Sequence, residues 1–142
     1  MRKIHLMLLA IFILAGCNTD SALTFSEVDI DHIDGEIQSF FQEVREENGA
    51  HLYIDNENTT LFVYLNGSNV LQGEKAVTFT DFDVEGDSST LNLSYKSEKT
   101  SDYSNSSLDY EQFYRVKVDK VPEVIRLFHN DEEASFGTIS GN

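Results

Sequence analysis

The chain has 142 residues, and its 25 aspartates and glutamates outnumber its 10 lysines and arginines, giving a formal net charge of −15. A protein this acidic is repelled by the phosphates of DNA and RNA, which excludes nucleic acid as a partner. Cys17 is the single cysteine, so the chain forms no internal disulfide and its fold depends on a hydrophobic core.

The first 16 residues have the organisation of a secretory signal. Arg2 and Lys3 form a short positive segment, and residues 4–15 are almost wholly apolar. A membrane-spanning helix needs about 20 apolar residues, and this run is shorter. A charged start followed by a short apolar run and small residues is typical of a cleaved export signal.

The end of this segment resembles the lipobox of bacterial lipoprotein precursors. It consists of Leu14, Ala15, Gly16 and Cys17. The resemblance implies that Cys17 receives a diacylglyceryl group and that signal peptidase II cuts between Gly16 and Cys17. It also implies a lipid-anchored protein of the cell membrane that faces outside the cytoplasm, because two acyl chains hold a protein stably on a bilayer. The residues after Cys17 are not assigned to any family.

Removal of the signal makes the remaining domain more acidic. Without Arg2 and Lys3, eight basic residues face 25 acidic ones, a formal charge of −17. With Cys17 lipidated, the domain has no cysteine nucleophile and no thiolate ligand for a metal, and we expect no cofactor. The charge is explained either by solubility or by attraction to a basic partner among exported proteins, and we expect membrane contact only through the lipid anchor.

The pattern after Cys17 predicts one domain with one helix. We expect a short polar tether at 17–24, a globular domain at 25–129 that opens with a strand within 25–33, and a loose polar tail at 130–142. The helix is expected over about 35–48, with Asp34 as its cap and Asn48 before a terminating glycine. Its apolar stripe has the spacing i, i+3, i+4, i+7 and consists of Ile37, Phe40, Phe41 and Val44.

Beyond Gly49 the apolar residues alternate with a period of two, which predicts strands. In residues 60–67, for example, Leu61, Val63 and Leu65 are expected on one face, opposite two aromatic residues. These strands predict an α+β fold, in which the helix packs on an antiparallel sheet or half-open barrel of about five to seven strands. The expected strands after the helix are 51–55, 60–67, 76–84, 90–96, 113–121 and 123–128.

Residues 81–87, DFDVEGD, match the first half of a calcium-binding loop. Asp81, Asp83 and Glu85 are therefore candidate metal ligands. The twelfth position of such a loop needs a bidentate glutamate, and this chain has Asn92 there. Because the alternation also slips by one residue near Thr80, we favour a β-bulge followed by a turn, with the acidic side chains in solvent.

The polar stretch 97–112 separates two well-patterned strands. A long loop without structure of its own is often functional or mobile. Tyr103 and Tyr110 stand among serines and asparagines, as in many binding loops, and are our candidate binding residues. The alternative is a solvated connection whose tyrosines lie against the sheet.

Three functional interpretations remain open from the sequence. The first is a membrane-anchored binding or adaptor module. The second is an inhibitor or assembly factor for another exported protein. The third is an enzyme, which we regard as less favoured because the sequence contains none of the usual catalytic motifs.

Overall fold

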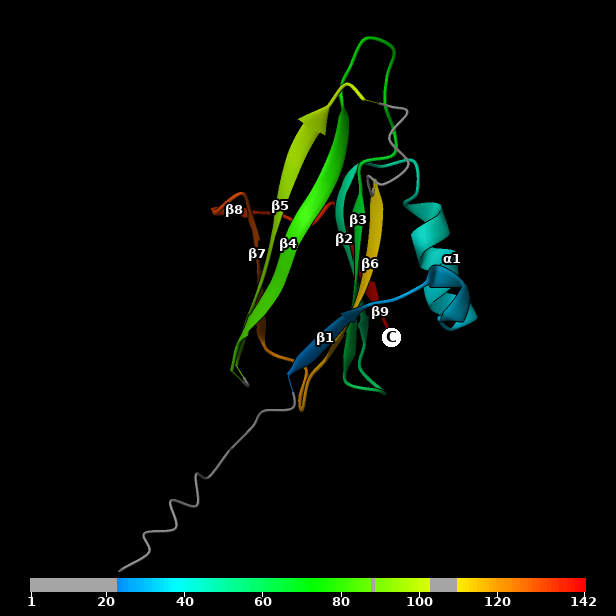
Figure 1. Cartoon of the computed structure of the whole chain (residues 1–142). Coiled ribbons are helices and arrows are strands. Elements are labelled where there is room, and N and C mark those ends of the chain that lie inside the picture. The colour runs from blue at the N-terminus through cyan, green and yellow to red at the C-terminus, as the bar shows by residue number, and fades with distance from the viewer. Residues whose placement is uncertain (1–22, 88, 103–109) are drawn as a thin grey trace, which may run out of the picture.

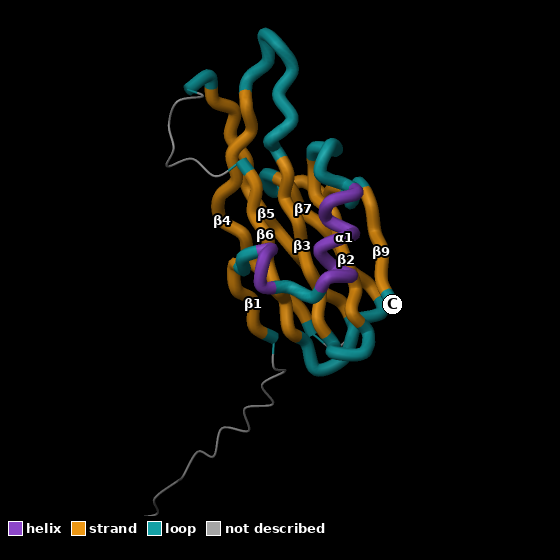
Figure 2. Tube along the Cα trace, turned by 90° about the vertical axis from the view of Figure 1, so that its right-hand side faces the viewer, coloured by secondary structure: helices purple, strands orange, loops and turns teal. Residues whose placement is uncertain are grey.

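The computed structural model describes residues 23–87, 89–102 and 110–142, and within them the chain forms three layers (Figure 1). An outer layer contains the α-helix, a five-stranded sheet forms the middle, and a four-stranded sheet forms the other outer layer. Figure 2 shows the same arrangement after a quarter turn, with the helix in front of the middle sheet. The expected signal segment, its expected cleavage site and Cys17 lie outside the described residues.

The middle sheet has the order β1-β6-β3-β2-β9. All neighbours in it are antiparallel except β2 and β9, which are parallel. Its strands are β1 (Thr24–Glu27), β2 (Gly49–Asp55), β3 (Thr60–Asn66), β6 (Glu111–Lys117) and β9 (Thr138–Gly141).

The outer sheet has the order β4-β5-β7-β8. Here β5 and β7 are parallel, and the other neighbours are antiparallel. Its strands are β4 (Ala76–Gly86), β5 (Thr90–Thr100), β7 (Val124–His129) and β8 (Glu132–Ala134).

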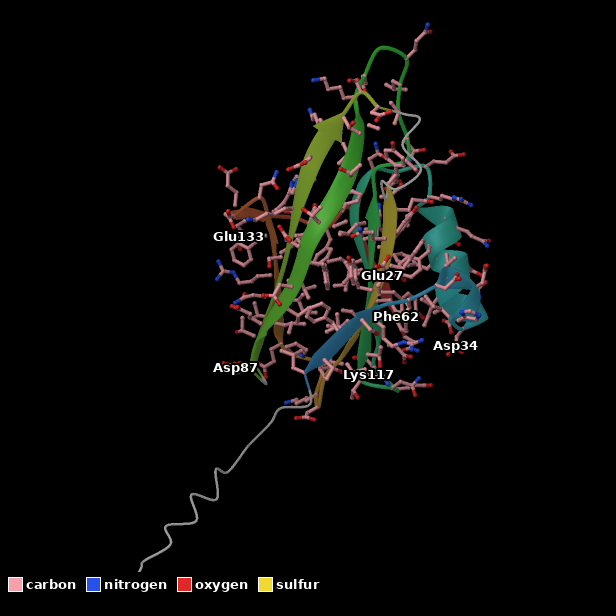
Figure 3. All side chains as sticks on the ribbon, in the orientation of Figure 1. Glu27, Asp34, Phe62, Asp87, Lys117 and Glu133 are labelled. Carbon is pink, nitrogen blue, oxygen red and sulfur yellow. The ribbon has the colours of Figure 1, made fainter. Side chains whose placement is uncertain are left out.

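Strand β3 shows why the middle sheet is buried on both faces. Leu61, Val63 and Leu65 point into the core between the two sheets, whereas Phe62 and Tyr64 pack under the helix. This confirms the two faces predicted for the strand. In Figure 3, Phe62 lies on the helix side of the middle sheet and Glu133 lies on the far side of the outer sheet.

The helix is confirmed but is shorter than predicted. A 3₁₀ turn, η1 (Ile30–His32), precedes α1 (Gly35–Glu43), and the predicted apolar stripe of α1 is buried. Asp34 stands at the N-cap but its side chain makes no capping hydrogen bond. The chain turns after Glu43 instead of continuing to residue 48, because the buried Asn66 side chain donates to the main-chain carbonyls of Arg45 and Glu47 at 2.7 and 2.9 Å.

The predicted slip in β4 is a β-bulge. The register with β5 shifts between Thr80 and Asp83, and Asp81 takes a positive φ of 54°. Beyond the bulge Phe82 and Val84 are buried, and the acidic residues between and after them are exposed. The extra residue therefore returns the apolar side chains of β4 to the core.

The α+β class agrees with the structure, but the expected single sheet or half-open barrel of five to seven strands is wrong. The described residues form nine strands in two sheets, and two strand pairs are parallel. The first strand is also short, because β1 begins at Thr24 and η1 follows it. Residues 97–100 and 111–112, expected within a loop, belong to β5 and β6.

The loose tail predicted for residues 130–142 is also wrong. It contains β8 and β9, and β9 completes the middle sheet beside β2. Asn142 fastens the end of β9, since its Oδ1 accepts from the Asn56 amide at 2.9 Å and its Nδ2 donates to Asp55 at 3.4 Å. Backbone pairing thus orders a segment whose side chains are mostly exposed.

Among the described residues, no helix has both the length and the apolar character required to cross a membrane.

Candidate functional site

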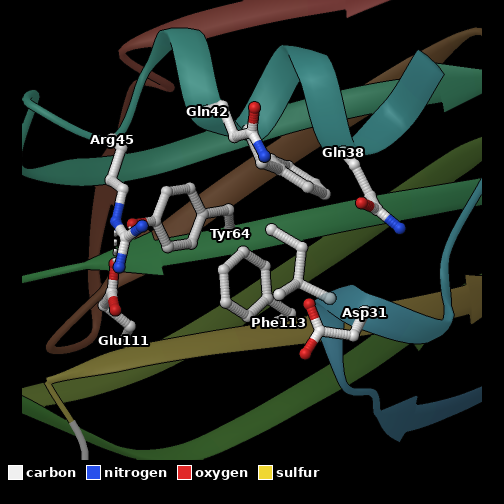
Figure 4. Close-up of a pocket in the computed structure, with 9 residues that line it drawn as sticks. Asp31, Gln38, Gln42, Arg45, Tyr64, Glu111 and Phe113 are labelled. Carbon is white, nitrogen blue, oxygen red and sulfur yellow. Dashed lines mark hydrogen bonds and ion pairs between the residues drawn. The ribbon is translucent and has the colours of Figure 1, made fainter. Parts of the chain in front are cut away.

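A cleft of about 140 Å³ opens between the helical layer and the middle sheet (Figure 4). It receives side chains from η1, α1, the turn after α1, β3 and β6. Small-molecule sites usually enclose about 300–1,000 Å³, so this cleft suits one side chain or a fragment of similar size. Its lining residues are Ile30, Asp31, Gln38, Phe41, Gln42, Arg45, Tyr64, Glu111 and Phe113.

The floor of the cleft is aromatic and rigid. Tyr64 of β3 and Phe113 of β6 are partners in the strand register, so their side chains leave the same face of the sheet. Their rings stack with centroids 4.4 Å apart and an interplanar angle of 6°. Phe41 of α1 meets both rings edge-on, at 5.5 and 5.4 Å. Tyr64 and Phe41 are themselves buried, so the floor offers the partly exposed Phe113 ring, which these two rings hold in place.

One end of the cleft holds a hydrogen-bonded charge pair. The Tyr64 hydroxyl donates to Glu111 Oε1 at 2.5 Å, and Arg45 Nε lies 3.6 Å from the same oxygen. Burial raises the pKa of Tyr64, and the hydrogen bond and charge of Glu111 raise it further, so the hydroxyl keeps its proton. Because the Arg45 side chain is 68% exposed, its ion pair is screened and stabilises the fold by less than about 1 kcal/mol.

The other end carries hydrogen-bond acceptors. Gln38 donates through Nε2 to the Ile33 carbonyl at 2.6 Å, which leaves its Oε1 to accept. Asp31 is positioned by η1, whose first turn is closed when the Asp31 amide donates to Asp29 Oδ1 at 3.1 Å. Asp31 and Gln38 therefore offer oxygens beside the aromatic floor, where a cation with N–H donors is the matching ligand.

The cleft lies within an acidic layer, which we define as residues 27–47. The structure describes all 21 of these residues, and Arg45 is their single lysine or arginine. The layer carries eight exposed carboxylates: Glu27, Asp29, Asp31, Asp34, Glu36, Glu43, Glu46 and Glu47. Such a layer attracts cationic groups and repels anions.

The structure places the candidate metal ligands elsewhere. Asp81, Asp83 and Glu85 lie exposed along β4, in the outer sheet and not at the cleft. Among the described residues, no three or more histidine, cysteine, aspartate or glutamate side chains gather in an arrangement able to hold a metal ion. Asp87 instead closes the β4–β5 turn, since it accepts from the amides of Ser89 and Thr90 at 2.8 and 2.9 Å.

Tyr110, the candidate binding tyrosine that the structure describes, does not line the cleft. Tyr103 lies outside the described residues. Tyr110 immediately precedes β6, where its carbonyl accepts from the Gly67 amide at 2.8 Å and its hydroxyl donates to the Asp102 carbonyl at 3.2 Å. The same ring lines a shallow hollow with Val70. Tyr110 therefore has a fastening role in the described structure.

Sequence reasoning missed the pair formed by Ser97 and His129. Ser97 Oγ lies 2.5 Å from His129 Nε2, and the imidazole stacks on Tyr95 with ring centroids 4.6 Å apart. A serine beside a histidine suggests a nucleophile and its base, but neither residue lines the cleft. The parallel pairing of β5 with β7 brings them together, and no spacing in the sequence indicates that contact.

Most of the cleft residues were likewise not singled out from the sequence. Phe41 was expected to be buried, but Tyr64, Glu111 and Arg45 carried no motif. Their signal was limited to the period of the strands and of the helix that bear them. Comparison with protein-family models, curated proteins and solved structures finds no match to this chain. The description of the cleft therefore rests on this structure alone.

Proposed function

We propose that this chain is a lipid-anchored, extracytoplasmic binding module. It captures another exported protein by binding a basic surface on that partner. The observation that carries this proposal is the acidic layer, which has eight exposed carboxylates against one arginine and supplies six of the nine residues that line the cleft. Complementary charge accelerates encounter between proteins and selects among partners. The partner is therefore a protein whose contact surface is rich in lysine or arginine.

The chemistry of the cleft favours binding over catalysis. Tyr64, Glu111 and Arg45 satisfy one another, and the raised pKa of Tyr64 keeps that group from acting as a base near neutral pH. The Ser97–His129 pair lies apart from the cleft, so it adds no nucleophile there. A reaction would need a nucleophile or base directed at a bound substrate.

The lipid anchor is supported by the sequence from Leu14 to Cys17. The described domain begins close to this segment, with β1 starting at Thr24 at the end of the molecule opposite the β3–β4 connection (Figure 1). An anchored chain of this design confines its acidic layer to a narrow zone above the membrane. Confinement raises the effective concentration of the module toward other membrane-proximal proteins.

Site-specific photocrosslinking tests the proposal in cells of the natural source. A photoreactive phenylalanine analogue replaces Gln42, which lines the cleft and is exposed, and a second version carries it at Glu132 on the outer sheet. We expect the first position to trap a distinct protein with a basic surface, identified by mass spectrometry, and the second to trap none of it.

Two triple variants separate local recognition from net charge. Asp34→Asn with Glu43→Gln and Glu46→Gln removes three charges from the acidic layer, and Asp83→Asn with Glu85→Gln and Glu132→Gln removes three from the outer sheet. We expect the first variant to lose the crosslink and the second to keep it. Equal loss in both would overturn the proposal. An adaptor, an inhibitor and an assembly factor would all use such a contact, and the identity of the trapped protein distinguishes them.

A further inference from the structure

We propose that the cleft receives a single lysine or arginine side chain of the partner and so serves as the anchor point of the interface. This inference rests on the proposed function and specifies its ligand chemistry. Three features of the cleft support it: its size, the nature of its floor and the unequal engagement of its two carboxylates.

The size of the cleft excludes most other ligands. A space of about 140 Å³ is below the range of small-molecule and cofactor sites. A side chain that enters it lies between α1 and the middle sheet (Figure 4). Interfaces commonly concentrate their binding energy where one side chain of the partner fills such a pocket.

The floor suits the stem of a basic side chain. The partly exposed Phe113 ring presents apolar surface, backed by the buried Tyr64 ring on which it stacks, and Ile30 adds an aliphatic wall. Lysine and arginine bury their methylene stems on such surfaces while keeping the charged head near polar groups. The Phe113 ring also attracts the cationic head electrostatically.

The two carboxylates of the cleft differ in how far they are already engaged. Glu111 accepts from Tyr64 and pairs with Arg45, whereas Asp31 makes no side-chain hydrogen bond or ion pair with the rest of the described chain. Figure 4 shows these carboxylates at opposite ends of the cleft. The incoming cation therefore binds at the Asp31 end, where Oε1 of the Gln38 side chain is a second acceptor.

An anionic ligand is disfavoured by the same geometry. Arg45 is the cation of the cleft and is paired with Glu111. An anion would have to displace that carboxylate while approaching through the acidic layer. The arrangement thus selects for positive charge.

The test uses the full-length protein in detergent micelles, observed by NMR with isotope labels. The probe is Nα-acetyl-lysine methylamide, and the control is Nα-acetyl-norleucine methylamide, which has the same stem without the ammonium group. We expect the lysine probe to shift the Gln38 side-chain amide and the Phe113 ring signals saturably in the millimolar range. The norleucine compound should bind at least about ten-fold more weakly, because it lacks the charge.

Matched variants locate the cation. Asp31→Asn removes the unpaired carboxylate of the cleft, and Glu43→Gln removes a charge from the same layer outside the cleft. We expect the first to weaken the lysine probe about five-fold and the second less than about two-fold. Equal weakening by both variants, equal binding of norleucine, or no shift of the cleft signals would each overturn the inference.

Different experimental results would overturn the proposed function and the proposed lysine or arginine anchor. Absence of lysine binding together with an intact crosslink at Gln42 would overturn the cleft as anchor and support the acidic layer as a binding surface. Lysine binding in the cleft without any partner crosslink would support the cleft chemistry and overturn the proposed capture of a protein.

Discussion

Replacement of Gly67 by alanine tests a close contact between the two sheets. Gly67 directly follows β3, and its amide donates to the Tyr110 carbonyl at 2.8 Å. A Cβ at this position would stand 2.5 Å from the carbonyl oxygen of Val77 and 2.9 Å from its Cβ, both in β4. Neither atom can rotate away, because one belongs to the main chain and the other is fixed directly to it.

The loss of stability in Gly67→Ala follows from how far β4 must move to relieve the contact with the added Cβ. Ordinary contact begins at 3.4 Å, so β4 would have to withdraw by about 0.9 Å from the end of β3. Overpacking of this kind costs about 1–3 kcal/mol. For a domain of this size the melting temperature should fall by roughly 4–10 °C.

Gly35→Ala is the matched control. A Cβ at Gly35, the first residue of α1, meets nothing within 4 Å. Both substitutions reduce the freedom of the unfolded chain equally. We expect Gly35→Ala to be neutral or to stabilise the fold by up to about 1 kcal/mol, since alanine is the better helix former. The difference between the variants therefore isolates the contact with Val77.

Urea denaturation followed by far-ultraviolet circular dichroism measures both free energies of unfolding. The m-values should agree, because the surface exposed on unfolding is nearly the same. Hydrogen exchange should also show reduced protection of the β4 amides in Gly67→Ala. If Gly67→Ala is as stable as the original chain, or if Gly35→Ala loses as much, the close approach of β3 and β4 is refuted.

Four further predictions concern acid stability, a hydrogen bond, ions and the anchor. Burial alone would raise the pKa of Asp55, but hydrogen bonds from two asparagines outweigh burial and lower that pKa. The ionised Asp55 therefore stabilises the fold fully at pH values above the ordinary pKa of aspartate. This stabilisation is lost as the pH falls through the lowered pKa. From about pH 4 downward, the free energy of unfolding should thus decline more steeply in the original chain than in Asp55→Asn, as measured by urea titration. Ser97→Ala should lose about 1 kcal/mol in the same assay through the missing contact with His129, and no change would show that the contact is unimportant. Sodium chloride should raise the melting temperature by screening the acidic domain, and calcium at matched ionic strength should add nothing; a saturable calcium effect that Asp81→Asn abolishes would contradict our interpretation of that strand. Cys17→Ser should abolish incorporation of a fatty-acid analogue in metabolic labelling, and a labelled serine variant would disprove the lipobox.

The sequence by itself determined most of the secondary structure, because periodicity is a local property. The helical repeat places the four apolar residues between Ile37 and Val44 on one face of the helix, and all four are buried. Alternation along 60–67 correctly indicated which residues of β3 share a face. The slip at Thr80 indicated the bulge, since one extra residue is required to keep Phe82 and Val84 on the buried face.

The role of Gly67 shows the limit of local reasoning. The sequence pair Asn66–Gly67 is of a kind typical of tight turns. In the structure Asn66 is buried and holds the chain after α1, and Gly67 has no positive φ that would demand glycine. The absence of a side chain matters there because β4 passes within contact distance. That requirement arises from the packing of the two sheets against each other, which the local sequence does not indicate.

The tertiary structure alone decided how the strands divide into two sheets and where the cleft lies. Alternation shows that a strand has a buried face, but it does not identify the layer that covers the face. Strand β9 has mostly exposed side chains and forms because β2 offers it backbone hydrogen bonds, which leave no trace in its composition. The cleft likewise joins Asp31, Gln38 and Arg45 to Tyr64 and Glu111 across the layers. Contacts between residues so far apart depend on how the layers stack, and the whole core determines that stacking. The spacing of residues within one segment indicates only which face of the segment is buried.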